Sequence, residues 1–398
     1  MAAPEPGLRV VTGRLLAAAL LVVTAGCSSS TGHASTPTTS RSATPSATVT
    51  VLPTATPGGT TDLPVTQVGF TCNLPVVVMA GGGDFASYTG GFISFPAGTY
   101  AQDPNGLITT GSSPQEVATK AAPVLTGVPQ DGPTFYDSGI HRWVPVSAAQ
   151  SSADGSSYAY ATTGASSSEG ATFHIVNAST ATQKTFTVAV PNVGASNGVQ
   201  VMEYDGSGVY FVVTQLEAYP VGVWRLDART GKVTALARVA NVMAVRGGYA
   251  WGGAVDPHDP TPPRVPASRV LFDSIVQESL SSGAQTAWFY SPGRSETLLG
   301  LASGRPVINI GDGPDFPLFG GEVRLLDHPS SGAEDSGQLV YGGGVALSDP
   351  QADGDRVWFG SDRGIYLYPA DGTLQKVYAV AASQAGAITK IAPAGVCR

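Results

Sequence analysis

The feature that most constrains the fold is a repeat of short strands and glycine turns. Beyond residue 65 the chain runs strand, Gly or Asp-Gly turn, strand, most clearly within residues 206–239. Four turn glycines follow one another at intervals of 52, 49 and 40 residues: Gly231, Gly283, Gly332 and Gly372. A unit of about 40–50 residues with three or four short strands is typical of a β-propeller blade. The sequence therefore predicts an all-β propeller.

The repeat also gives an expected number of blades. Stacked βαβ units need crossover helices, for which only residues 113–125 show any periodicity, and a jelly roll has no such repeat. Five units can be counted along the chain: 142–190, 199–239, 242–292, 295–343 and 344–380. The two termini together supply a sixth. Residues 107–141 fit the repeat poorly, which leaves a seventh or an irregular blade open.

The two ends of the chain complete one another. The final segment, "AITKIAPAGVCR", supplies the first strand of a blade and its turn and then stops. The missing second strand is "NLPVVVMAGG" (73–82), which follows Cys72 directly. Cys72 and Cys397 therefore fall at the same turn of one blade, and we expect the N- and C-terminal strands to pair and close the ring. An exported protein permits a disulfide there; the alternative is two unpaired buried thiols.

Two stretches resemble known propellers. "SSADGSSYAYA" (151–161) resembles the "SPDGxxYAY" strand–turn–strand of TolB-like, PD40-type propellers. "FYDSGIHRWVPV" (135–146) is similar to a kelch-style "YDxxxxxW" hairpin. The resemblance to TolB-like lipoproteins implies a six-bladed propeller with protein partners, and it names no ligand and no reaction.

The first residues read as an export signal. Arg9 and Arg14 precede a short apolar run, Leu15–Val23, which ends in "TAGC". This resembles a bacterial lipoprotein signal, in which cleavage leaves Cys27 as the first residue with a lipid on its sulfur. Thr24 stands where such signals usually have Leu. The alternative is an ordinary secretory signal, with Cys27 discarded or left as a free thiol.

These features predict three parts: a signal at 1–26, a tether at 27–64 and the propeller at 65–398. The tether is rich in Ser, Thr and Pro and has too little apolar surface to fold. We expect it to hold a monomeric propeller at the extracytoplasmic face of the cell membrane. The net charge of −8 and the absence of a basic stripe argue against nucleic-acid binding.

Motifs for metal, cofactor or covalent chemistry are weak. The five histidines lack HxH or HExxH spacing, and the cysteines have other roles, so neither a metal nor a cofactor is expected. "GASNG" (194–198) matches the nucleophile motif G-x-S-x-G around Ser196, but a strand follows it where that motif needs a helix. "DPHDP" (256–260) and "QADGDR" (351–356) read as a stiff loop and an Asp-Gly turn.

The loops that join second to third strands are the best candidate for a site, because in a propeller they open on one face. Each carries an acid: Asp84, Glu169, Glu217, Asp256 with Asp259, Asp312 with Asp315, and Asp362. His258 lies between two of these acids, and aromatic residues lie nearby at Phe85, Tyr88, Tyr219 and Phe316. An acidic, aromatic mouth would suit a cation, a basic peptide or a sugar. The alternative is that these are ordinary polar loops.

The function expected from this pattern is binding or scaffolding without catalysis. Its partners would be envelope proteins, or a small or basic ligand at the mouth of the propeller. The alternative is a propeller enzyme, such as a lyase, hydrolase or cyclotransferase, that acts at the acidic mouth.

The lipidation of Cys27 can be tested directly. Cys27→Ser should release the protein into the medium or leave it unprocessed, because the lipid-bearing sulfur is lost. Membrane fractionation and fatty-acid labelling of both forms measure this. An unlabelled wild-type protein, together with a variant of normal mobility that stays in the membrane fraction, would contradict lipidation.

Overall fold

The computed structural model describes thirteen stretches of the chain and is almost entirely β within them. The described residues are 62–81, 87–109, 135–163, 170–180, 182–190, 197–215, 220, 222–255, 272–312, 321–330, 337–370, 372–381 and 388–398. In these stretches no helix is long and apolar enough to span a bilayer. The signal, Cys27, nearly all of the tether and residues 113–125 lie outside the described residues.

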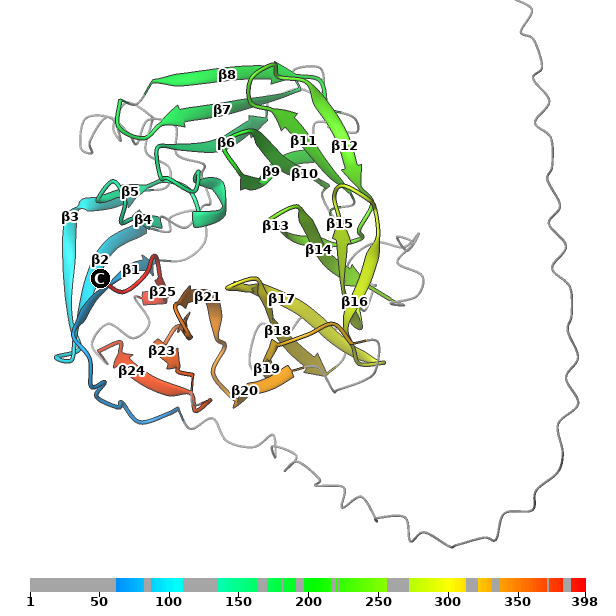
Figure 1. Cartoon of the computed structure of the whole chain (residues 1–398). Coiled ribbons are helices and arrows are strands. Elements are labelled where there is room, and N and C mark those ends of the chain that lie inside the picture. The colour runs from blue at the N-terminus through cyan, green and yellow to red at the C-terminus, as the bar shows by residue number, and fades with distance from the viewer. Residues whose placement is uncertain are drawn as a thin grey trace, which may run out of the picture. The chain divides into compact units, whose positions relative to one another are not determined.

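Six blades surround a common centre (Figure 1). The closing blade orders its strands β25 (Ile388–Pro393), β1 (Cys72–Ala80), β2 (Ser87–Phe95) and β3 (Thr99–Thr109). The second has β6 (Ser157–Thr163), β7 (Ala171–Asn177) and β8 (Gln183–Val188). The third has β9 (Asn197–Tyr204), β10 (Gly208–Gln215), β11 (Val223–Asp227) and β12 (Val233–Ala237).

The other three blades repeat the same antiparallel order. The fourth has β13 (Val242–Arg246), β14 (Tyr249–Ala254), β15 (Ser274–Ser279) and β16 (Gln285–Tyr290). The fifth has β17 (Arg294–Ala302), β18 (Arg305–Asp312), β19 (Gly321–Leu326) and β20 (Gly337–Gly343). The sixth has β21 (Ser348–Asp353), β22 (Arg356–Gly360), β23 (Gly364–Tyr368) and β24 (Gln375–Ala379). The sequence-based prediction of a six-bladed propeller is confirmed.

The turns that set the repeat are left-handed at their glycines. Gly231, Gly283 and Gly372 have φ angles of 74°, 70° and 82°, and each lies in the turn between the third and fourth strands of its blade. Side chains with a Cβ rarely adopt this conformation, so the turn position calls for glycine. This requirement is the physical origin of the regular spacing in the sequence.

The stretch that fits the repeat poorly contains a hairpin. β4 (Phe135–Asp137) pairs with β5 (Arg142–Val144), and a single 3-10 turn follows at Ala148–Gln150. Tyr136 and Trp143 are opposite one another, and both rings pack on Phe92 of the closing blade. A Cβ at Gly90 would lie only 2.8 Å from the Trp143 ring, so this hairpin sits tightly on the blade.

Apolar cores fill the spaces between neighbouring blades. Between the fifth and sixth blades, Val323 and Leu325 belong to the same buried cluster as Phe359 and Tyr366. Each fully buried side chain of this size contributes about 1.5–3 kcal/mol relative to exposure. A blade therefore depends on the blades on both sides of it.

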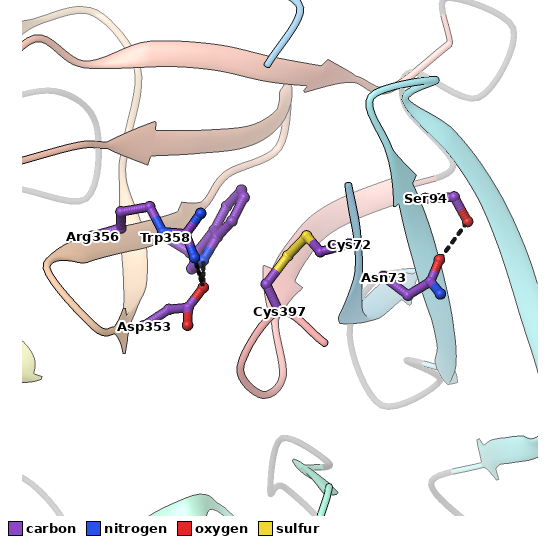
Figure 2. Close-up of a disulfide and its surroundings, with 7 residues drawn as sticks. All are labelled: Cys72, Asn73, Ser94, Asp353, Arg356, Trp358 and Cys397. Atoms are coloured by element: carbon purple, nitrogen blue, oxygen red, sulfur yellow. Dashed lines mark hydrogen bonds and ion pairs between the residues drawn. A yellow bond between two sulfur atoms is a disulfide. The ribbon is translucent and has the colours of Figure 1, made fainter. Parts of the chain in front are cut away.

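The closing blade is assembled from both ends of the chain, as the sequence predicts. β1 pairs antiparallel with β25, and backbone hydrogen bonds continue beyond it, with the Asn73 amide donating to the Arg398 carbonyl at 2.7 Å. Cys72 and Cys397 form a disulfide at the start of β1, with their Cα atoms 5.6 Å apart (Figure 2). Beside it, Asp353 accepts hydrogen bonds from Arg356 and Trp358 of the sixth blade.

Residues 62–70 run along the sixth blade before β1 begins. Val65 makes a parallel bridge with Lys376 of β24, and the Asp62 carboxylate accepts a hydrogen bond from Tyr366 and pairs with Lys376. Burial acts to raise the pKa of Asp62, but the hydrogen bonds from Lys376 and Tyr366 lower it overall. Folded contacts thus begin three residues before the boundary that composition suggests.

The disulfide should contribute measurably to stability. The double variant Cys72→Ser, Cys397→Ser should lose about 2–5 kcal/mol of unfolding free energy, since the bridge restricts a very long loop of the unfolded chain. Urea denaturation measures this loss, and reductant should shift the wild type but not the variant. Equal midpoints for oxidised wild type and variant would contradict this prediction.

Candidate functional site

The predicted acids belong to one end of the propeller, here called the loop end. It is the end where second strands finish, third strands begin and successive blades connect. The following candidates lie outside the described residues: Asp84, Glu169, Glu217, Asp256, His258, Asp259 and Asp315. Asp312 ends β18 opposite Arg294, with its side chain also outside the described part, and Asp362 is exposed.

The structure brings a different set of charged residues together at the loop end. This loop-end cluster consists of Asp273, Arg294, Glu296, Glu322 and Arg324. Asp273 immediately precedes β15, whereas the other four lie on β17 and β19 of the next blade. The cluster therefore lies where the fourth and fifth blades meet, at the base of the loops that carry Asp256 and Asp315.

Backbone pairing fixes the geometry of the cluster. The Glu296 amide donates to the Phe272 carbonyl at 2.8 Å, and the Ser291 amide donates to the Asp273 carbonyl at 2.9 Å. These two bonds hold the approach to β15 against the start of β17. In the fifth blade, Glu296 is opposite Ile310 and Ile310 is opposite Glu322, so their side chains share one face of the sheet.

Both arginines of the cluster interact with one glutamate. Arg294 Nη1 lies 3.5 Å from Glu322 Oε2, and Arg324 donates to the other oxygen of Glu322. Glu322 thus pairs with two guanidinium groups, whereas Glu296 has no ion pair among the described residues.

Glu296 is the unusual member of the cluster. It is 1% exposed, and neither carboxylate oxygen accepts a hydrogen bond from a donor in the described part of the chain. Burial, together with the charge of Asp273, raises its pKa to about 10, against the smaller opposing effects of the Arg294 charge and of the nearby Ser291 amide, whose well-formed hydrogen bond goes to the Asp273 carbonyl. Glu296 is therefore neutral at pH 7 and keeps a proton that an exposed glutamate would have lost.

The cluster can hold a cation more readily than it can coordinate a metal. Among the described residues no three His, Cys, Asp or Glu side chains lie close enough to bind a metal ion. Two neighbouring carboxyl groups, one of them protonated, offer hydrogen-bond acceptors and a removable proton. This arrangement suits the binding of a positive group or the donation of a proton.

Hollows outlined by the described residues lie at the opposite end of the propeller. One, of about 590 Å³, is lined by Phe70, Asp355, Arg356 and Gln375 among others, and a second, of about 490 Å³, includes Ser207 and Arg229. Both involve first-to-second and third-to-fourth strand turns. Neither contains a residue of the loop-end cluster.

The comparison with known proteins bears on the fold and not on the function. No protein-family model and no curated protein matches the chain. It is similar to TolB from Acinetobacter baumannii, at 11% identity and a TM-score of 0.36, over 77% of this chain and 69% of that one. It is also similar to the β-propeller domain of the trilobed protease from Pyrococcus furiosus, at 10% identity and a TM-score of 0.39, over 77% of this chain and 86% of that one.

Among the similar structures is also a prolyl endopeptidase. It is 10% identical with a TM-score of 0.42, and the match covers 76% of this chain but 42% of that enzyme. The chain thus spans less than half the length of this peptidase.

One sequence interpretation, the rejection of a nucleophile motif at Ser196, can be compared with the structure at this end. A strand, β9, begins at Asn197 directly after Ser196, as the argument against a nucleophile motif expected, although Ser196 itself lies outside the described residues. The loop-end cluster was not predicted, because its residues lie on or beside strands whereas the predicted acids lie in loops. The available signal was the alternation in "RSETLL", which places Glu296 on the same face as Leu298.

The state of Glu296 predicts how stability depends on pH. The folded protein keeps the proton of Glu296 up to a pH of about 10, whereas the unfolded chain releases it near 4.5, so stability falls as pH rises between these values. The slope is at most about 1.4 kcal/mol per pH unit. Glu296→Gln should flatten this slope and raise the melting temperature at pH 8. A variant that melts lower than wild type at pH 8 would show that Glu296 is ionised and paired in the folded protein.

Proposed function

We propose that this protein is a binding or scaffolding propeller held at the extracytoplasmic face of a bacterial membrane. A lipid on Cys27 anchors it, and the segment up to about residue 61 serves as the tether. The loop end holds the partner, and the chain carries out no chemistry on it.

The observation that supports this proposal is the buried Glu296 at the base of the loop end, whose carboxyl has no hydrogen-bond partner among the described residues. A buried carboxyl without hydrogen-bond partners reduces stability, so it calls for an explanation outside folding. Perturbed acids of this kind are frequent at functional sites. The disulfide that closes the ring lies at the start of β1, at the opposite end of the propeller, and so leaves the loop end available to a partner.

The arrangement of the blades supports binding over a broad face. Each loop end is fixed by strands that pack on two neighbours, so loops of different sequence project from a rigid base. A rigid base reduces the entropy lost when a partner binds. The acids in these loops add a negative field that would favour a positively charged partner.

Catalysis is the second candidate, and one observation favours it. A protonated carboxyl beside an ionised one is the arrangement that enzymes use for a general acid and its partner. An experimental structure in which His258 and two of the loop acids lie within about 4 Å of one point would support catalysis. A mouth filled with salt bridges would support binding.

Binding at the loop end predicts stabilisation by positive ligands. Millimolar calcium or a polybasic peptide should raise the melting temperature of the detergent-solubilised chain, because a ligand of the folded state stabilises it. Asp256→Asn with Asp259→Asn should abolish that gain and should not lower stability without ligand, since repulsion between the acids is relieved. Differential scanning fluorimetry measures both. A melting temperature indifferent to calcium and peptide, with a less stable double variant, would contradict loop-end binding.

A further inference from the structure

We propose that a hollow between the second and third blades binds the phosphate group of a phosphate ester through Lys184 and Arg229. The hollow has a volume of about 490 Å³ and lies at the end of the propeller opposite the loop end. The inference goes beyond the proposed function, because it concerns a second site that does not involve the loops of the loop end.

Two neighbouring blades form the walls of the hollow. Ile175 of β7 and Lys184 of β8 belong to the second blade, and Tyr204 of β9 belongs to the third. The turn at residues 206–207 and the end of β11 with its turn, residues 227–229, complete the lining. This lining extends from exposed turn residues down to Tyr204, which is 5% exposed, so a ligand can enter from solvent.

The ammonium group of Lys184 is held in place without a carboxylate partner. It donates hydrogen bonds to the carbonyls of Ala228 and Arg229, at 3.0 and 2.9 Å, and lies 4.8 Å from the centre of the Phe186 ring. All these partners are neutral, so no ion pair among the described residues compensates the charge. An ammonium group has three donors, and one of them remains for a ligand. Because the cation is already fixed, little side-chain entropy is lost when an anion binds.

Arg229 supplies a second positive charge at the same hollow. It lies in the turn between β11 and β12, lines the hollow and is exposed. Its guanidinium group makes no ion pair or hydrogen bond within the described residues, and its carbonyl is one of the two that hold Lys184. Two cations without ion pairs thus come together in a chain whose net charge is −8.

The acid that lines the hollow, Asp227, is occupied by its own turn. Its carboxylate accepts hydrogen bonds from the Thr230 hydroxyl and from the Thr230 and Arg229 amides, and it lies 3.7 Å from Arg225. The hydrogen bond from the Thr230 hydroxyl, together with those from the amides, lowers the pKa of Asp227, so the group is ionised at neutral pH. It does not pair with Lys184 or Arg229.

The acid of the adjoining turn, Asp205, is satisfied in a similar way. It accepts hydrogen bonds from the Ser207 and Gly208 amides and from the hydroxyls of Ser207 and Tyr210. With Arg225 counted, three basic and two acidic side chains surround the hollow. It therefore keeps an excess of positive charge, which an anion would compensate.

The placement of the donors favours phosphate over carboxylate. Lys184 approaches from the second blade and Arg229 from the third, so the donors are spread over more than one direction. The Tyr204 hydroxyl donates to the Gly206 carbonyl at 3.5 Å, a long hydrogen bond that can be exchanged for one to an anion. A phosphate group has enough free oxygens to accept from all three, and lysine and arginine are common phosphate ligands. A hollow of this volume also has room for the rest of a small ester.

The larger hollow, of about 590 Å³, lacks these features. Its basic residue, Arg356, donates to Asp353 at 3.0 Å and lies 4.5 Å from the Phe70 ring. Asp355, which is exposed, adds a negative charge to its lining. The positive charge there is already paired, so only the hollow between the second and third blades combines free donors with excess positive charge among the described residues.

Titration calorimetry on the detergent-solubilised full chain, with glycerol phosphate as the probe, tests the proposal. Wild type should bind one equivalent. Arg229→Gln should fold as wild type does, since its guanidinium group has no partner in the described residues, and should lose affinity at least about tenfold because a charge-assisted hydrogen bond is lost. Lys184→Gln should lose a similar factor. Thermal melts without ligand measure separately what Lys184 contributes to the junction of the two blades.

Lys232→Gln is the matched control. It removes one positive charge from the same turn, but Lys232 is exposed and does not line the hollow, so this variant should bind as wild type does. Acetate at equal ionic strength should bind at least about tenfold more weakly than glycerol phosphate. A short-chain phosphatidic acid added to the micelles distinguishes the source of the phosphate: tighter binding than glycerol phosphate assigns the site to a lipid headgroup, and weaker binding to a soluble ester.

Three results would overturn the proposal: no binding of glycerol phosphate by wild type, equal affinity for acetate, or an equal loss of affinity in Lys232→Gln and Arg229→Gln. The last result would show attraction by overall charge alone. None of them bears on the loop end, whose binding is tested separately with calcium and the variant of Asp256 and Asp259.

Discussion

The pairing of β1 with β25 is the constraint on which the rest of the ring depends. Each blade buries its faces against two neighbours, so an open ring would leave the first and last blades with an exposed apolar face each. Val76 and Val78, opposite Pro393 and Ile391, bring together residues more than 300 positions apart. The contact loses much chain entropy when it forms, and the covalent bond between Cys72 and Cys397 offsets part of that loss.

The segment before β1 reinforces the same closure. Phe70 packs between the Phe95 ring of the closing blade and the Trp358 ring of the sixth blade, with centroid distances of 6.3 and 6.1 Å. Arg356 lies 4.5 Å from the Phe70 ring, and Asp62 satisfies the almost fully buried Lys376. Residues 62–70 therefore connect the closing and sixth blades.

The closure could be predicted from the sequence, whereas the charged cluster could not. The turn glycines fix the phase of the repeat, and the phase shows that the chain ends after a first strand and begins with a second, which places Cys72 beside Cys397. The environment of Glu296 depends on which face of β17 packs against the fourth blade and on which groups of that blade lie next to the carboxyl. Sequence alternation gives the face but not the donors. Glu278, in a similar strand context, accepts hydrogen bonds from Arg238 and Gln285, whereas Glu296 accepts none from the described residues.

A well-closed ring and an unsatisfied buried acid are compatible for a physical reason. The apolar cores between blades and the terminal disulfide stabilise the ring as one cooperative unit. The free energy lost by burying the Glu296 carboxyl therefore lowers the stability of the whole ring and does not unfold one blade alone. A site that depends on desolvation also requires rigid walls, because a loose interface would admit water and satisfy the carboxyl without any ligand. The backbone bonds from Glu296 to Phe272 and from Ser291 to Asp273 supply that rigidity at the junction of two blades. The pairing of β1 with β25, which runs from Val76 to Ala80, thus keeps every blade packed between two neighbours, and this packing holds the junction of the fourth and fifth blades rigid.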